Sequence, residues 1–236
     1  MQKLRTAVHT IKRLGRYSVG REVFYRRDLS CAFEVLGSYG AQFAICPELI
    51  SHDSVVYSCG IGTDVSFDLE IIHRFGAEVH AFDPTPRSLE WLKMQQLPGR
   101  FRVHEYGLAD HDGSTSFALP NSPLHVSHSM VLGRSHQKAT ISAPVRRIAS
   151  IMKELGHTRI DLLKMDIEGA EYDVIDDLVT GSVPVRQLCV EFHHRWPEIG
   201  AGKTRNAIDR LRAAGYRIFH SADTGEEYSF VGLGAC

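Results

Sequence analysis

The sequence predicts a doubly wound α/β fold, with a seven-stranded sheet that is mostly parallel and has an antiparallel last strand. Three observations predict it. Apolar strand-like runs alternate with helix-like runs from Val55 onward, which favours parallel strands joined by helices. Glycines (Gly60 and Gly62) and then an acid (Asp83) follow the first two strands. Near residue 225, two strand-like runs flank an acidic glycine turn, which indicates a hairpin that places the last strand antiparallel.

The elements are predicted from local pattern. The first strand is Val55–Cys59, and the helix after it, Ser66–Phe75, ends before Gly76, a common helix stop. The second strand, Glu78–Phe82, leads into a proline-containing turn. Further strands are expected at 102–107, 161–166, 187–193, 216–220 and 228–232, with helices at 88–96, 150–155, 168–179 and 204–214. Ser88 and Glu168 are thus expected at helix starts.

Residues 109–135 are polar and rich in Gly, Ser, Pro and His. This stretch is too long for an ordinary connection, so we expect a lid or a substrate loop with a short strand at 115–119. A further strand-like run follows at 140–146. His125, His128 and His136 lack the spacing of metal ligands and are interpreted as polar groups of the loop.

Bulk composition excludes several classes of protein. A net charge of −1 over 236 residues gives no electrostatic footprint for extended nucleic-acid binding. No apolar run approaches the roughly 20 residues that span a bilayer, and no secretory leader is recognised. The five cysteines are scattered and odd in number, which favours reduced thiols over disulfides or a zinc site. We therefore expect a cytoplasmic protein; its oligomeric state is not predicted.

Two regions are expected, a basic helical arm and cover at 1–50 and a catalytic domain at 51–236. The first 27 residues contain eight Lys and Arg residues but only one acid, Glu22. Leu4, Val8, Ile11 and Leu14 have helical spacing, so the arm is expected to be amphipathic. It either lies on the domain or contacts an anionic membrane or an acidic partner.

The glycine pattern predicts an adenosine-containing cofactor. Gly60 and Gly62 allow a sharp turn close to a ligand, and Asp83 can accept hydrogen bonds from two ribose hydroxyls. A dinucleotide fingerprint has a third glycine where this chain has Val65. Asp64 would repel a pyrophosphate but tolerates a cationic ligand. The pattern therefore favours S-adenosylmethionine (SAM) over a nicotinamide or flavin dinucleotide.

Candidate catalytic residues follow the fourth and fifth strands. Asp166 comes after an apolar strand, and His193 shares a strand face with Glu191. His193 is a candidate base because its unperturbed pKa lies near neutrality. The two carboxylates and the histidine could instead hold a divalent cation, although no metal is predicted. Glu168 and Glu171 can be explained as helix-capping acids.

The chain resembles the FkbM family of SAM-dependent methyltransferases over roughly residues 55–178. The resemblance is carried by the glycine turn at 60–62, A-F-D-P at 81–84, G-L-A-D at 107–110 and, above all, K-M-D-I-E-G-A-E at 164–171. It implies the Rossmann-like class I methyltransferase fold and transfer to a hydroxyl oxygen of a small molecule or a sugar. A SAM-binding protein without transfer activity and a nicotinamide-dependent oxidoreductase are the alternatives.

The same resemblance implies roles for individual residues. Gly60 and Gly62 would pass along the methionine part of SAM, and Asp83 would hold the ribose. Asp110 would lie beside the adenine, and Asp166 near the methionine end and the transferred methyl. The family usually has an acid at the position of Ser58 and a later glycine at that of Asp64, so Asp64 or Asp166 would contact the SAM ammonium. The proton acceptor would be His193 or Asp166.

Overall fold

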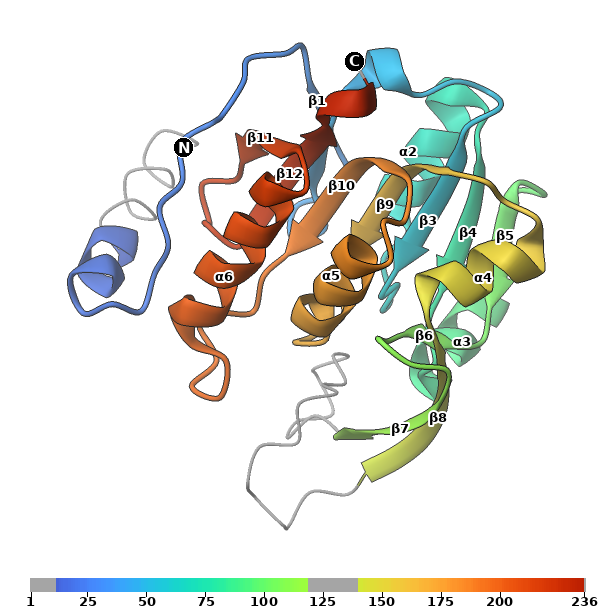
Figure 1. Ribbon diagram of the computed structural model, residues 1–236. Coiled ribbons are helices and arrows are strands. Elements are labelled where there is room, and N and C mark those ends of the chain that lie inside the picture. Colours follow the sequence, from blue (N-terminus) through green and yellow to red (C-terminus); the bar gives the residue numbers. More distant parts are fainter. Residues whose placement is uncertain (1–11, 119–139, 236) are drawn as a thin grey trace.

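The computed structural model describes residues 12–118 and 140–235, which are arranged around one central sheet (Figure 1). Its strand order is β11-β12-β10-β9-β3-β4-β5. The strands are β3 (Val55–Cys59), β4 (Glu78–Phe82), β5 (Phe101–His104), β9 (Ile160–Met165), β10 (Val185–Glu191), β11 (Tyr216–Ser221) and β12 (Glu227–Gly232).

The pairing within this sheet confirms the predicted fold class. Strands β5, β4, β3, β9 and β10 are parallel to their neighbours, whereas β12 runs antiparallel to both β10 and β11. The last strand is therefore inserted antiparallel between two others. This is the class I methyltransferase arrangement of a doubly wound sheet.

Helices cover both faces of the sheet (Figure 1). The first face carries α4 (Ile148–Leu155), α5 (Glu171–Thr180) and α6 (Gly200–Ala213), and the second carries α2 (Ser66–Phe75) and α3 (Pro86–Lys93). Each face has its own apolar core. Because both faces are covered, the ligand-binding edge is the one at the carboxyl ends of the parallel strands.

Of helices α2 to α6, only α2 begins at the predicted residue; α4 begins at Ile148 rather than 150, and α6 begins at Gly200 rather than 204. Helix α3 begins at Pro86, because the fixed φ of proline suits the first helical position, and Ser88 instead lies buried inside the helix. Helix α5 begins at Glu171 rather than Glu168. Glu168 and Gly169 have φ values of 52° and 101°, so the chain passes through a left-handed turn before the helix starts.

Smaller elements surround the main sheet. The predicted cover is a hairpin of β1 (Glu34–Leu36) and β2 (Phe43–Ile45), followed by the 3-10 helix η1 (Pro47–Leu49). It packs on the face of β10, β12 and β11. Another small sheet contains β6 (Gly107–Leu108), β7 (Gly113–Ala118) and β8 (Thr140–Arg146), and the 3-10 helix η2 (Leu233–Ala235) follows β12.

Several predictions about loops and cysteines can be followed only in part. Strand β7 is the short strand expected in the polar stretch, while residues 119–135 of the predicted lid and the three histidines lie outside the described residues. Cys59 and Cys189 are buried thiols, and Sγ of Cys31 lies 3.0 Å from Sγ of Cys46. Cys236 is outside the described residues. In the described part of the chain, no helix combines the length and apolarity needed to cross a bilayer.

The N-terminal segment is anchored by Glu22, which is fully buried. Its carboxylate contacts Nε2 of His194 at 2.7 Å and Nη2 of Arg195 at 2.7 Å. Burial alone would raise the pKa of Glu22, but hydrogen bonds from these two side chains lower it to about 2. The segment from residue 12 onward therefore packs on the domain. Leu14 and Tyr17 remain exposed there, so a membrane or acidic partner of the arm stays a prediction.

A histidine cluster within the sheet predicts a pH effect on stability. His80 is buried, and its Nδ1 lies 3.0 Å from Nε2 of His104. Burial, followed by repulsion from His157 and His104, lowers the pKa of His80 to about 4. The unfolded chain therefore binds this proton more readily than the native one. The contribution of neutral His80 to the free energy of unfolding is therefore fully present above pH ~6.5 and is lost as the pH falls towards ~4.

We expect the free energy of unfolding to fall on acidification by on the order of 2 kcal/mol more in the wild type than in His80→Gln. Urea unfolding of both proteins at pH 7 and pH 4.5 measures this difference. Identical pH dependence of the two proteins would contradict the assignment, because the carboxylates that titrate in this range are common to both.

Candidate active site

The glycine turn after β3 is shaped by close approach to β9. Gly60 and Gly62 have φ values of 78° and 58°, which favour glycine. A Cβ on Gly60 would overlap the backbone carbonyl of Asp166, approaching its carbon to 2.7 Å. A Cβ on Gly62 would meet no described atom within 4 Å. Gly60 therefore allows two chain segments to touch, and Gly62 borders open space.

Asp83 holds this turn in place. Its Oδ2 accepts hydrogen bonds from the backbone N–H groups of Ile61 (3.0 Å) and Gly62 (3.1 Å). Its Oδ1 accepts from the backbone N–H of Thr85 (2.8 Å) and from the Thr85 hydroxyl (2.6 Å). The predicted ribose-binding carboxylate is thus buried and already has four donors, about the capacity of a carboxylate.

Lys164 connects the glycine turn with three acids. Its Nζ donates to the carbonyl oxygen of Gly60 at 2.6 Å. Burial raises the pKa values of Asp68 and Asp166, and the charge of Lys164 opposes this rise. Burial would also raise the pKa of Asp64, but hydrogen bonds from Ser38 and Ser66, with a smaller effect of Lys164, lower it. Asp64 also accepts from the Ser66 N–H at 2.7 Å, which ties it to the start of α2. The positive charge of Lys164 is therefore shared among acids on both sides of β3.

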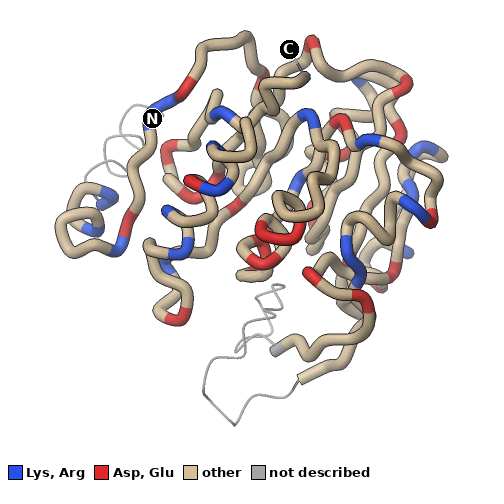
Figure 2. The backbone as a smooth tube through the Cα atoms, viewed as in Figure 1, with Lys and Arg blue, Asp and Glu red and all other residues tan. Residues whose placement is uncertain are grey.

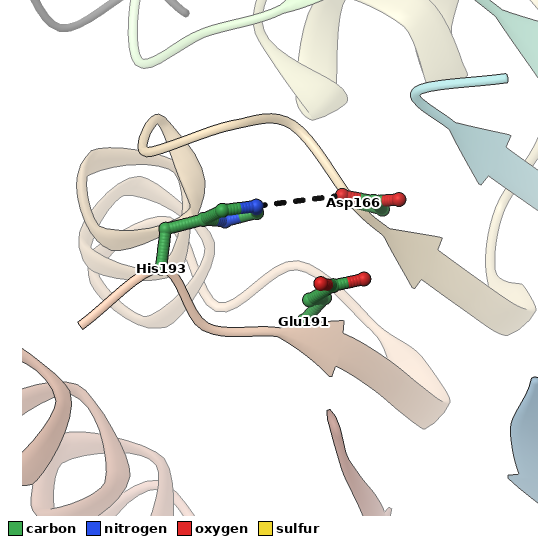
Figure 3. Close-up of side chains that lie close together, drawn as sticks. All are labelled: Asp166, Glu191 and His193. Atoms are coloured by element: carbon green, nitrogen blue, oxygen red, sulfur yellow. Dashed lines mark ion pairs between the residues drawn. The ribbon is translucent and has the colours of Figure 1, made fainter. Parts of the chain in front are cut away.

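The ends of β9 and β10 bring Asp166, Glu191 and His193 together (Figure 3). Nε2 of His193 lies 3.7 Å from Oδ1 of Asp166 and 3.2 Å from Oε2 of Glu168. Acidic residues gather where β9 leads into α5 (Figure 2). The predicted catalytic pair, Asp166 and His193, is thus in one cluster with two further carboxylates.

Glu171 positions the histidine. It is fully buried, and its Oε1 accepts from the backbone N–H of His193 at 3.0 Å and lies 3.2 Å from Nδ1 of the same residue. Its Oε2 accepts from the N–H of Gly169 at 2.8 Å. Glu171 lies in the first turn of α5, but the N–H at its Oε2 belongs to Gly169, which precedes the helix. Its contacts therefore orient the imidazole, whose Nε2 faces the cluster, rather than cap the helix.

Burial or contacts within the cluster raise the pKa values of His193, Glu191 and Asp166. Burial alone would lower the pKa of His193, but hydrogen bonds with Glu168 and Glu171 raise it to about 12. Burial and repulsion from Asp166 raise the pKa of Glu191 to about 9. Burial also raises the pKa of Asp166, with Lys164 and His193 opposing the shift. Without a bound cation, these contacts favour the protonated form of His193 and the neutral form of Glu191.

Asp110 lies after β6 at the same edge of the sheet. Its carboxylate is half-exposed and lies 2.8 Å from Nδ1 of His111. It is also near the first turn of α5, because after burial its charge is the next cause that raises the pKa of Asp173. The predicted adenine neighbour thus faces the same region as the start of α5.

One buried acid of this region was missed by the sequence reasoning. Asp68 lies in the first turn of α2 and is 2% exposed; burial raises its pKa to about 6, while Lys164 opposes the shift. A signal was present, because Asp68 lies three residues after the buried Val65 and three before the buried Ile71. An acid on the apolar stripe of a helix indicates a buried cationic partner.

Comparisons with known proteins agree with this arrangement. The family model of the methyltransferase FkbM domain matches residues 50–218. Probable methyltransferase-like protein 24 of Rattus norvegicus is 28% identical over 191 residues, which are 76% of this chain and 46% of that protein. The 2-O-methyltransferase NoeI of Sinorhizobium fredii is 29% identical over 131 residues, 50% of this chain and 53% of NoeI.

A crystal structure of methyltransferase FkbM from Methylobacillus flagellatus is also similar, with 16% identity, a TM-score of 0.47 and coverage of 77% of this chain and 44% of that one. The chain spans about half the length of the curated relatives named above. The order and directions of the strands are those of the class I methyltransferase fold. The chain belongs to the FkbM methyltransferase family.

Proposed function

We propose that this chain is a SAM-dependent methyltransferase that transfers a methyl group to a hydroxyl oxygen of a small molecule or a sugar. The observation that carries the proposal is the meeting of the glycine turn, Asp83 and Asp166 at the carboxyl ends of three adjacent strands, beside the open space at Gly62. NoeI, a relative by sequence, is described as a 2-O-methyltransferase, which supports an oxygen acceptor.

The residues of the site suit SAM in charge and shape. SAM carries a sulfonium and an ammonium group, and the site supplies Asp64 and Asp166 near the glycine turn. Gly62 leaves room for a ligand close to the backbone. We assign Gly60, Gly62, Asp64, Asp83, Asp110 and Asp166 to cofactor binding. When bound, SAM supplies an electrophilic methyl group.

Asp83 can accept ribose hydroxyls although its carboxylate already has four donors. The Thr85 hydroxyl, which donates to Oδ1 of Asp83, also lies 2.8 Å from Oγ of Ser88. A hydroxyl has one proton, so Thr85 can donate to Ser88 instead and free a site on Asp83. In this proposal Asp83 both orders the glycine turn and binds the ribose.

Asp166 is the better of the two proposed proton acceptors. A protonated imidazole cannot accept a proton, and the pKa of His193 is raised to about 12 by its hydrogen bonds with Glu168 and Glu171, which outweigh burial. The carboxylate of Asp166 lies beside it with its pKa raised by burial, which makes it a stronger base than an exposed aspartate. We propose that Asp166 takes the hydroxyl proton and that His193 positions and balances the acids around it.

A SAM-binding protein without transfer activity is the second candidate. The motivating observation is that Ser58 and Asp64 replace the residues usual in the family. Ser58 is fully buried. The carboxylate of Asp64 already accepts hydrogen bonds from the Ser66 N–H, at the start of α2, and from the Ser38 hydroxyl. Cofactor binding without turnover on any hydroxylated acceptor would favour this reading.

Calorimetric titration with S-adenosylhomocysteine tests cofactor binding. We expect micromolar affinity for the wild type and no binding of NADH. Asp83→Ala should weaken binding by ~1–3 kcal/mol, the value of charge-assisted hydrogen bonds. Asp53→Ala is the matched control, because Asp53 is exposed and precedes β3, at the other end of the sheet. Equal affinity of Asp83→Ala and the wild type would remove the ribose assignment, and tight NADH binding would favour an oxidoreductase.

A further inference from the structure

We propose that Asp166, Glu191 and His193 bind a divalent transition-metal cation. Each of these residues offers one ligand atom, and the three atoms lie within 4.8 Å of one another. They come from the ends of the adjacent parallel strands β9 and β10, which hold them on the rigid part of the fold (Figure 3). The role of the cation in catalysis rests on the proposed function, whereas its binding does not.

The separations suit a common ion. Ligands about 2.1 Å from one cation lie roughly 3 to 4 Å from each other. Nε2 of His193 and Oδ1 of Asp166 are 3.7 Å apart, and the full set spans at most 4.8 Å. A shift of less than about an ångström, within the range of a carboxylate rotation, completes the site.

His193 is oriented in the way that metal-binding histidines are. Its Nδ1 lies 3.2 Å from the carboxylate of Glu171, which is fully buried and also accepts from the backbone N–H of His193. This contact leaves Nε2 as the atom that faces Asp166 and Glu168. A carboxylate behind a ligating histidine fixes the ring and its tautomer. Glu171 is thus a positioning residue outside the set of three ligands.

The charge around the three ligands also favours a cation. Asp166 lies close to Glu168 and Glu171, and Glu191 is paired in register with Glu227 on β12. Lys164 and His193 face this group, but Lys164 donates to the Gly60 carbonyl and is shared with Asp64 and Asp68. Asp166 and Glu191 are half-buried, and neighbouring carboxylates of this kind are stabilised when they are paired or bind a metal. Binding would release the protons of Glu191 and of Nε2 of His193, because metal ligands are deprotonated, and the divalent ion would replace their positive charge.

The ligand types indicate which ions fit. Imidazole nitrogen suits first-row transition metals, and carboxylate oxygen suits Mg²⁺ and Mn²⁺, so a mixed set favours Mn²⁺ or a similar ion. Three protein ligands leave coordination positions open for water or for the acceptor hydroxyl. A bound hydroxyl loses its proton more readily. The O–H proton would pass to the second oxygen of Asp166 as the O–CH₃ bond forms and the C–S bond breaks.

Mn²⁺ titration of the full chain tests the site. After dialysis against EDTA and then metal-free buffer, free Mn²⁺ is followed by electron paramagnetic resonance. We expect one Mn²⁺ per chain with micromolar affinity. Glu191→Gln should weaken binding at least 10-fold, and Glu171→Gln, which disturbs only the orientation of His193, by ~10–100-fold. Glu227→Gln removes the same charge from the neighbouring strand but no ligand atom, so it should weaken binding clearly less than Glu191→Gln does.

Absence of Mn²⁺ binding to the folded wild type, or equal losses in Glu191→Gln and Glu227→Gln, would overturn the proposal. Thermal melting of every variant confirms that it is folded. Calorimetry with S-adenosylhomocysteine on the same samples separates the two proposals. Cofactor binding without Mn²⁺ binding would reject the cation site alone, and Mn²⁺ binding without cofactor binding would reject the cofactor assignment alone.

Discussion

Gly60→Ala is expected to lower the free energy of unfolding by about 3 kcal/mol or more, which corresponds to a fall in Tm of ~10 °C in a chain of this size. Two effects combine. The residue has a φ of 78°, which side chains disfavour, and the added Cβ would overlap the carbonyl of Asp166. The β3 turn and the start of the loop after β9 would have to separate.

Gly62→Ala is the matched control for this change. Its φ of 58° is also left-handed, but the added Cβ enters open space, so only the conformational cost of about 1–2 kcal/mol is expected. Thermal and urea unfolding of both variants isolate the contribution of the close contact. Equal melting temperatures would mean that the two chain segments are not in contact at Gly60.

Asp166→Asn is expected to reduce kcat by ~10²–10⁴-fold, because the amide cannot accept the proton of the acceptor hydroxyl. The substitution keeps the shape of the side chain, and the backbone N–H of Asp166 that donates to Cys59 is unaffected. The assay requires an acceptor from a screen of sugars and hydroxylated small molecules, with and without Mn²⁺. Unimpaired turnover would exclude Asp166 as the proton acceptor.

His193→Ala separates a base from a positioning residue. Both roles predict a loss of kcat of ~10²–10⁴-fold with cofactor binding intact, so the pH profile decides between them. If His193 were the base, the kcat profile of the wild type would rise with a pKa that disappears in His193→Ala. If Asp166 is the base, the ascending limb persists in His193→Ala and is lost in Asp166→Asn. A fully active His193→Ala would exclude both roles for the imidazole.

Most of the fold could be predicted because its strands are short apolar runs with clear stops. The bounds of β3, α2 and β4 agree with those predicted, since Gly60, Gly76 and Asp83 end these elements unambiguously. The predicted start of α5 was wrong by about one helical turn. Glu168 is an ordinary helix-forming residue, and its left-handed φ depends on contacts from β10 that no local pattern shows.

The candidate site could be predicted in its residues but not in its charges. The rule that ligands bind at the carboxyl ends of strands found Asp83, Asp166, Glu191 and His193. It did not show that the imidazole of His193 lies between two carboxylates. The burial of His193 and its distances to Glu168 and Glu171 depend on the three-dimensional arrangement. Those contacts, rather than the residue type, raise the pKa of His193 and are the reason why we propose Asp166 as the base.

The burial of Glu22 affects where a fragment of this chain that keeps the candidate site can begin. This acid lies far outside the residues matched to the family, yet it neutralises Arg195 and contacts His194, immediately beside His193. A domain grafted from residue 51 onward would carry all the candidate catalytic residues but would leave Arg195 with one of its two carboxylate partners, Glu226, and a buried histidine without its acceptor. We therefore expect that a stable fragment of this chain must begin at or before residue 22, and that an exchange between relatives should keep the acid and its two basic partners together.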